Sequence, residues 1–266
     1  MPEGIFNSRE LLNPGLCRAD VWVVEPQSLH PEQSDRLLRV LSADERHRMQ
    51  RFHYEQDRAA YLAAHGLKRF TLSSLQPEIS PSAWSFVVSP HGRPEIESAS
   101  GRSRWRFNLS HTRTLVACLI TRDVDCGVDV EAVNPSFHFE GVGSRVLAPT
   151  EWALLAAASE SKRPGLFYRF WTLKEAYTKA LGLGMQLPFH QVAFELGDDS
   201  ARLHSPSEGW HFEQWDPGAT HLLAAAIRTS SPVRLFRHIG IPEVSGCPGL
   251  VQQGQPESIP TRGQLG

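Results

Sequence analysis

Two segments of this sequence occur twice, in the same order. The segment RVLSADE at residues 39–45 is similar to RVLAPTE at residues 145–151, and AYLAAHGL at residues 60–67 is similar to AYTKALGL at residues 176–183. Because both pairs keep their order with similar spacing, we interpret the chain as an internal duplication. This constrains the fold more than any other feature, since each half must then form the same succession of elements.

The patterns around these segments support the duplication. In each half a β-like run (residues 21–24 and 127–133) comes first, and the RVL segment then supplies helix-start residues before a long amphipathic helix. Closing strands are predicted at residues 84–89 and 105–120 in the first half, and at residues 191–196, 211–215 and 221–228 in the second. The sequence therefore predicts an α+β fold: a pseudo-dimer of two similar subdomains, each a small antiparallel sheet packed on a long helix.

The domain boundaries follow from the same pattern. Residues 1–122 are predicted to form the first subdomain and residues 123–237 the second. Residues 238–266 are rich in Gly, Pro, Gln and Ser without helical or strand periodicity, so we expect a flexible tail. Two such subdomains leave a cleft between them, where ligand sites tend to lie.

The two halves differ in their polar residues. Aligned on the AY…GL segment, Ala59 stands opposite Glu175 and Ala63 stands opposite Lys179. The second half has an acid and a lysine where the first has alanines, which is what an active site confined to the second half would produce.

Two acids in the run GVDVE occupy a predicted strand. Residues two apart share a strand face, so Asp129 and Glu131 point the same way, with their Cα atoms roughly 7 Å apart. Together with substrate oxygens and water, such a pair suits Mg²⁺, which prefers oxygen ligands. The alternative is a solvated strand face that carries two unrelated acids.

Three further segments carry candidate binding residues, each with a plainer alternative. Glu175 and Lys179 lie one turn apart on a predicted helix, where a surface ion pair is the alternative. The segment FNLSHT at residues 107–112 could bind an anion or simply form a turn, and PHGRP at residues 90–94 is a turn that carries a cation. The basic stretch at residues 46–69 fits either a solvated helix face or a phosphate-binding surface.

Composition narrows the class of protein. The net charge of −2 argues against a general binder of nucleic acid or of membrane surfaces. No run of eighteen apolar residues and no signal-peptide pattern is visible, so we expect a cytoplasmic protein. The four cysteines lack zinc or disulfide spacing, and Cys118 and Cys126 are expected to be buried thiols.

Taken together, FNLSHT, GVDVE, RVLAPTE and WTLKEAYTKALG resemble the motifs of the Sfp-type 4′-phosphopantetheinyl transferases, in the order found in that family. The resemblance covers roughly residues 40–230. It implies a pseudo-dimeric chain that binds coenzyme A and Mg²⁺ between its halves, with the basic first half contacting the coenzyme A phosphates.

The resemblance also assigns residues by position. Asp129, Glu131 and Glu175 match the metal carboxylates of the family, and Lys179 matches a lysine that contacts phosphates. Coenzyme A contacts are implied for Arg48, His91, Gly92, Arg93, Asn108, Ser110 and His111. The HGRP turn stands where a GKP form is common, which keeps the positive charge but changes its shape.

The reaction implied is transfer of 4′-phosphopantetheine from coenzyme A to a serine of an apo acyl- or peptidyl-carrier protein, with release of 3′,5′-ADP by a monomeric enzyme. Glu175 or Glu151 would accept the serine proton, and Lys179 would offset charge on the leaving group. Two other classes stay open: a metal-dependent phosphodiesterase or nuclease that uses the same acids, and a non-enzymatic module that binds coenzyme A or carrier proteins.

Overall fold

The computed structural model describes residues 15–97, 103–183, 187–205 and 208–244. Cys247 and the expected tail beyond residue 244 lie outside the described residues. Within the described part of the chain, no helix is long and apolar enough to span a membrane. Burial keeps Cys118 and Cys126 as free thiols, as predicted, and raises the pKa of Cys126 to about 12.

Each half of the chain forms helices between its strands. The elements of the first half are β1 (Cys17–Val24), the short helix η2 (Pro26–Ser28), α1 (Pro31–Val40), α2 (Ala43–Gln50), α3 (Glu55–Leu75), η3 (Pro81–Ala83), β2 (Phe86–Val88), β3 (Pro94–Ile96), β4 (Trp105–His111) and β5 (Val116–Arg122). Those of the second half are β6 (Cys126–Ala132), α4 (Glu140–Val146), α5 (Pro149–Ala157), α6 (Arg163–Leu181), η5 (Phe189–Gln191), β7 (Phe194–Leu196), β8 (Ser200–Leu203), β9 (His211–Trp215), β10 (His221–Ile227) and β11 (Val233–Ile239).

The strands form two main sheets. The first has the order β11-β1-β5-β4 and the second the order β6-β10-β9-β8-β7, while β2 and β3 form a separate hairpin. Each half begins with a strand that pairs antiparallel with the second strand of a later hairpin. In the first half β1 pairs with β5, and in the second half β6 pairs with β10. The protein is thus an α+β fold, as the sequence predicts.

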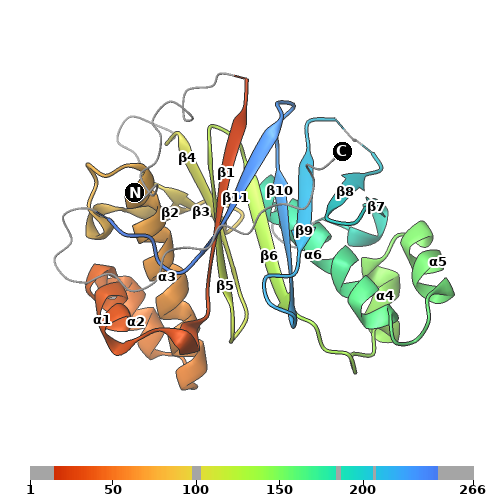
Figure 1. The fold of residues 1–266 in the computed structure, drawn as a ribbon, viewed down its shortest axis with the longest axis horizontal. Helices are drawn as coiled ribbons and strands as arrows, with labels where there is room; N and C mark the ends of the chain where they lie inside the picture. Colours follow the sequence, from red (N-terminus) through yellow and green to blue (C-terminus); the bar gives the residue numbers. More distant parts are fainter. Residues whose placement is uncertain (1–14, 98–102, 184–186, 206–207, 245–266) are drawn as a thin grey trace, which may run out of the picture.

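The two sheets lie between outer layers of helices (Figure 1). Helix α3 covers the first sheet on one side of the molecule and α6 covers the second sheet on the other. The inner faces of the sheets pack on each other through apolar side chains such as Val21, Leu119, Val128 and Leu223. Because Val128 and Val130 point into this inner layer, the alternate residues of β6 face α6.

Helix starts at both RVL segments agree with the prediction. Helix α2 begins after Ser42, whose backbone N–H donates to Glu45 Oε2 at 3.0 Å while its hydroxyl accepts from the Glu45 N–H at 3.2 Å. Helix α5 begins after Ala148, whose backbone N–H donates to Glu151 Oε2 at 2.8 Å. Each glutamate therefore caps the backbone at the start of its own helix.

The ion pairs of these glutamates correct the alignment of the long helices. Glu45 pairs with Lys68 at 2.8 Å and Glu151 pairs with Lys174 at 2.7 Å, and the lysine follows the glutamate by 23 residues in both cases (68 − 45 and 174 − 151). Glu175 therefore corresponds to Arg69, not to Ala59. The AY…GL similarity reflects shared helix-forming composition, whereas the buried pair fixes the register.

Strand β11 departs from the expected boundaries. It runs to Ile239, beyond the expected start of the tail at residue 238, and Val244 is buried against Leu37 and Phe70. It also pairs parallel with β1, so a strand from the end of the second segment completes the sheet of the first. Pairing between residues more than 200 positions apart leaves no local pattern in a sequence.

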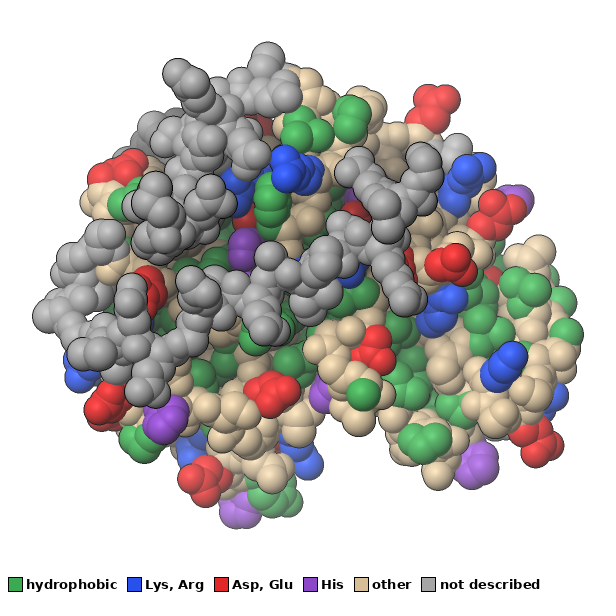
Figure 2. All heavy atoms as spheres, viewed as in Figure 1, with side chains coloured by type: hydrophobic (Ala, Val, Ile, Leu, Met, Phe, Trp, Pro, Cys, Tyr) green, Lys and Arg blue, Asp and Glu red, His purple; other side chains and the backbone are tan. Residues whose placement is uncertain are grey.

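Charged side chains are dispersed over the visible part of the face in Figure 2. The face in Figure 2 carries acidic and basic side chains side by side, in keeping with the net charge of −2. Its lower edge is indented between the two halves of the molecule (Figure 2).

Candidate active site

Strand β6 and helix α6 pack closely enough to bring their polar residues together. A Cβ atom at Gly127 would clash with the carbonyl of Ala176 and the backbone nitrogen of Ala180, so only glycine allows this approach. The close packing sets the acids of β6 directly against one face of α6. That face presents Trp171, Glu175 and Lys179, spaced one turn apart.

Asp129 is the most buried of the acids, with 4% of its surface exposed. Its Oδ1 atom accepts hydrogen bonds from Ser110 Oγ at 2.9 Å and from Lys179 Nζ at 2.7 Å. Its Oδ2 atom is buried and has no partner among the described residues. An unpaired buried carboxylate oxygen is costly, so this atom is suited to a bound cation or its water.

Glu131 and Glu175 are half-buried near Asp129. Glu131 Oε1 accepts a hydrogen bond from Trp171 Nε1 at 2.9 Å. Burial raises the pKa of Glu131, and the negative charge of Asp129 raises it further. Burial and then the charges of Asp129 and Glu131 also raise the pKa of Glu175, against the opposing effect of Lys179.

The three acids therefore crowd negative charge at one place, which favours a cation. Within the described residues, however, no three Asp, Glu, His or Cys side chains already stand in a metal-binding arrangement. The Lys179 ammonium is bonded to Asp129 instead, and it also donates to Ser110 Oγ at 3.0 Å and to the Val128 carbonyl at 3.2 Å. The donor set of three carboxylates fits a hard divalent ion once the Lys179 ammonium leaves Asp129.

Strand β4 joins the first half to this site. Asn108 Oδ1 accepts from the backbone N–H of Val128 at 2.9 Å, and Ser110 Oγ accepts from that of Val130 at 3.2 Å. Two residues that were predicted to contact coenzyme A thus accept hydrogen bonds from backbone N–H groups of β6. His111, at the end of β4, keeps much of its surface exposed, but its ring is partly desolvated by the surrounding protein. This desolvation and the positive charge of Lys179 lower the pKa of His111.

Arg93 reaches the second half from the β2–β3 turn. Its guanidinium donates to the Ala180 carbonyl in the last turn of α6 at 3.1 Å and bonds to Glu95 at 2.9 Å and to Asp125 at 3.4 Å. In the same turn, Gly92 adopts a positive φ of 88°. His91 in this turn and Arg48 on α2 are both exposed, and no described contact joins either one to the acids.

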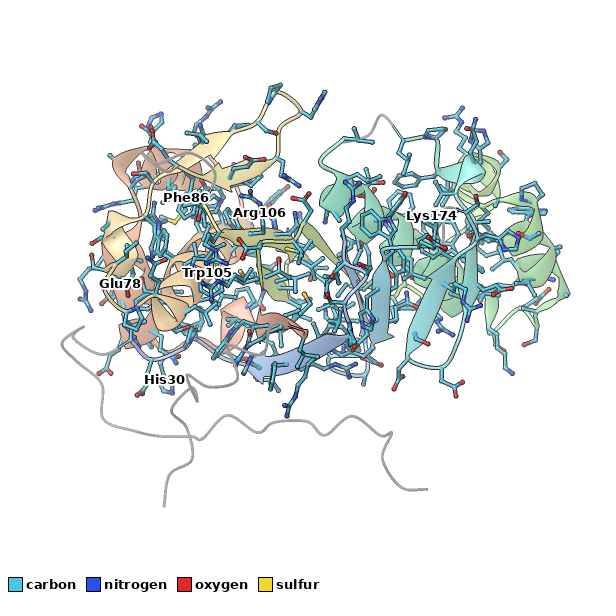
Figure 3. The ribbon with its side chains drawn as sticks, turned by 90° about the horizontal axis from the view of Figure 1, so that it is seen from above. His30, Glu78, Phe86, Trp105, Arg106 and Lys174 are labelled. Atoms are coloured by element: carbon cyan, nitrogen blue, oxygen red, sulfur yellow. The ribbon has the colours of Figure 1, made fainter. Side chains whose placement is uncertain are left out.

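Glu151 lies apart from the other predicted catalytic residues. It is completely buried, and besides Lys174 and Ala148 it binds the backbone N–H of Phe194 at 2.8 Å. Lys174 lies in the interior of the second half, away from Arg106 near the junction of the halves (Figure 3). A carboxylate enclosed in this way cannot meet the serine of another protein.

Sequence reasoning passed over two residues of this region, Trp171 and Lys174. The signal for Lys174 was the Leu-Lys pair that HGLKRF at residues 65–70 shares with WTLKEA at residues 171–176. The signal for Trp171 was its position one turn before Glu175 on the same helix face.

Comparison with known proteins gives matches to both halves. The family model described as "4′-phosphopantetheinyl transferase superfamily" matches residues 125–226. A second model, "4′-phosphopantetheinyl transferase, N-terminal", matches residues 28–121. The two matches adjoin between residues 121 and 125, near the predicted boundary.

Curated relatives carry the same description. The 4′-phosphopantetheinyl transferase HetI of Nostoc sp. is 31% identical over 165 residues, which cover 62% of this chain and 69% of the relative. The 4′-phosphopantetheinyl transferase Sfp of Bacillus subtilis is 28% identical over 208 residues, which cover 74% and 88%. The Thermotoga maritima holo-[acyl-carrier-protein] synthase structure matches 43% of this chain at 22% identity with a TM-score of 0.33, too slight a likeness to support any argument.

Proposed function

This chain belongs to the 4′-phosphopantetheinyl transferase superfamily, and we propose that it transfers 4′-phosphopantetheine from coenzyme A to a serine of an apo acyl- or peptidyl-carrier protein. The transfer would require Mg²⁺ and release 3′,5′-ADP. The observation that carries this proposal is the group of Asp129, Glu131, Glu175 and Lys179, held together by β6 and α6.

Asp129, Glu131 and Glu175 would hold the metal ion. The buried Asp129 Oδ2 atom, which has no partner among the described residues, supports this assignment, as do the pKa values of Glu131 and Glu175, which burial and the charge of Asp129 raise. When bound, Mg²⁺ supplies charge neutralisation of the pyrophosphate that is displaced in phosphoryl transfer.

Lys179 would leave Asp129 and contact the phosphates of coenzyme A. Its ammonium is already at the site, 28% of the side chain is exposed, and its four-carbon stem allows it to turn. In that position it would offset the negative charge that develops on the leaving 3′,5′-ADP.

Glu175 is the better of the two candidate bases. It is half-buried beside the acids, and its raised pKa favours uptake of the serine proton as the hydroxyl attacks the β-phosphate. Glu151, by contrast, is enclosed and ion-paired to Lys174, so we assign it the structural role of anchoring α6.

The first half would bind the nucleotide end of coenzyme A. Arg48, His91 and His111 are exposed and free to take part, and Arg93 would exchange one of its acidic partners for a phosphate. Asn108 and Ser110 would act mainly by fixing β6 against β4. We further propose that the halves arose by duplication and act as a pseudo-dimer within one monomeric chain.

The carrier protein would dock on the second half of the chain. The exposed apolar side chains Val142, Trp152 and Leu154 of α4 and α5 offer a surface for it. Trp152→Ala should raise the KM for the carrier while leaving the KM for coenzyme A unchanged. A kinetic panel of different apo carriers would then identify the pathway that the enzyme serves.

Mass spectrometry of the carrier tests the activity. The protein is incubated with coenzyme A, Mg²⁺ and an apo carrier, and a gain of about 340 Da, the mass of the transferred group, is expected on the serine. Asp129→Ala and Glu175→Ala should each abolish the gain while circular dichroism shows an intact fold, and the exposed Glu97→Ala serves as the matched control.

Other outcomes would support the other classes. Turnover of coenzyme A without any carrier would indicate a phosphodiesterase. Coenzyme A binding that calorimetry finds independent of Mg²⁺, with no transfer to any carrier, would indicate a binding module.

A further inference from the structure

Glu131 is the residue before the last of β6, and it is partly exposed to solvent. It is half-buried, and the negative charge of Asp129 repels it. A glutamate has three rotatable bonds, so it needs a partner to stay near another carboxylate. The only hydrogen bond of its side chain among the described residues is the one from Trp171 Nε1, at 2.9 Å.

Trp171 is itself held rigidly. Its ring stacks on Phe167 with centroids 6.2 Å apart and meets the edge of Phe189 at 5.8 Å. An indole N–H only donates, so it cannot compete for a cation. By fixing Oε1 it leaves Glu131 Oε2 available, since no described residue bonds to that atom.

We propose that Trp171 is the positioning residue that holds Glu131 in the metal site. The inference rests on the proposed function, because Glu131 is there a metal carboxylate. Trp171 touches neither substrate nor metal; it keeps one carboxylate oriented against the repulsion of the other acids. Partners of this kind typically change metal affinity by about 10- to 100-fold.

The test compares two tryptophans. Trp171→Phe removes the N–H and keeps a ring, and calorimetry of the protein with coenzyme A present should show Mg²⁺ affinity weakened by at least about 10-fold. Trp105→Phe is the matched control, since Trp105 is also half-buried and donates to a side-chain oxygen, Gln76 Oε1, at 3.0 Å. Its Mg²⁺ affinity should equal that of the wild type.

A double-mutant cycle separates positioning from a general effect on the fold. In a Glu131→Gln background, Trp171→Phe should weaken Mg²⁺ binding by less than about twofold, because the two residues act as one unit. An equal loss in both backgrounds, or no loss in the wild-type background, would overturn the proposal.

The wild-type protein gives a readout that does not need a folded variant. The indole ¹H–¹⁵N resonance of Trp171, assigned through its contacts with Phe167 and Phe189, should shift when Mg²⁺ is added. An unshifted resonance in a protein that binds Mg²⁺ would overturn the inference alone. A wild-type protein that binds no Mg²⁺ and modifies no carrier would instead refute the proposed function.

Discussion

The ionisation of several side chains in this protein depends on their neighbours as well as on their residue type. Asp129, Glu131 and Glu175 are ordinary acids in the sequence, yet in the folded protein burial and the charge of Asp129 raise the pKa of Glu131 and of Glu175, and the charge of Glu131 adds to the rise at Glu175. Lys179 offsets this effect through its ion pair with Asp129 at 2.7 Å. Three negative charges and one positive charge are therefore balanced at this site.

Neutralising Glu175 should stabilise the metal-free protein at neutral pH. Its folded-state pKa is raised, so ionisation costs stability above that pKa, and the cost disappears below the ordinary carboxyl pKa of about 4.3. Glu175→Gln should raise Tm by about 2–4 °C at pH 7, on the order of 1 kcal/mol, with a gain that shrinks as the pH falls. Thermal melts from pH 4 to 8 would check this, and a gain that grew on acidification would contradict it.

Lys179→Met should strengthen Mg²⁺ binding in the absence of coenzyme A, although it removes an active-site residue. The ammonium occupies Asp129 Oδ1 and repels cations, so its loss should raise the affinity by about 5- to 10-fold, roughly 1 kcal/mol. Calorimetry with the exposed Lys162→Met as control measures this. Coenzyme A affinity should fall in the same variant; weaker Mg²⁺ binding by Lys179→Met would show that the lysine does not compete.

At the scale of elements, the contact between β6 and α6 determines whether the site exists. Gly127 lets the strand approach the helix backbone, and the buried pair of Glu151 and Lys174 holds the other side of that helix. Both features lie outside the group of acids that they position.

Gly127→Ala should damage both stability and activity. Its Cβ would collide with the backbone of α6, and overpacking of this kind costs about 1–3 kcal/mol or more. Gly141→Ala in α4 is the control, because nothing lies within 4 Å of the added Cβ, and a helical Gly→Ala change stabilises by roughly 0.4–1 kcal/mol. Urea unfolding compares the two; a Gly127→Ala protein as stable as the wild type would contradict the packing argument.

Lys174→Met should destabilise the fold by about 3–5 kcal/mol, because it leaves Glu151 as an uncompensated charge in the core. The double variant Glu151→Gln/Lys174→Met should recover part of this loss, since neither charge then remains buried. Urea denaturation of the wild type, of both single variants and of the double variant checks both statements, and additive losses would refute the coupling.

For the molecule as a whole, β11 decides that the halves fold together. This strand follows β10 of the second sheet in the chain, but it pairs parallel with β1 of the first sheet. Its residues Val233 and Leu235 pack between the sheets. The sheet of the first half is thus complete only when the end of the chain reaches it.

Dividing the chain should expose this dependence. A fragment of residues 1–124 lacks β11, so we expect it to unfold without cooperativity or to aggregate, because it leaves β1 as an open edge. Mixing it with residues 125–266 should restore a cooperative transition in circular dichroism. A first fragment that melts cooperatively by itself would show that β11 is dispensable.

Much of this could be predicted from the sequence, because the signals were local. Strand and helix periodicity predicted the α+β class, and the resemblance of GVDVE and WTLKEAYTKALG to the motifs of a known family implied roles for the three acids and Lys179. The motifs themselves pointed to the family to which the chain belongs.

Only the tertiary structure decided which of these residues meet and which of them are buried. In the folded protein, Glu151 is buried with Lys174, and Trp171 donates a hydrogen bond to Glu131. Asn108 and Ser110 accept hydrogen bonds from the backbone of β6. Strand β11 also pairs with β1, at the other end of the chain. Such contacts join residues distant in the chain, and burial and pairing, which fix their energies, are properties of the folded molecule.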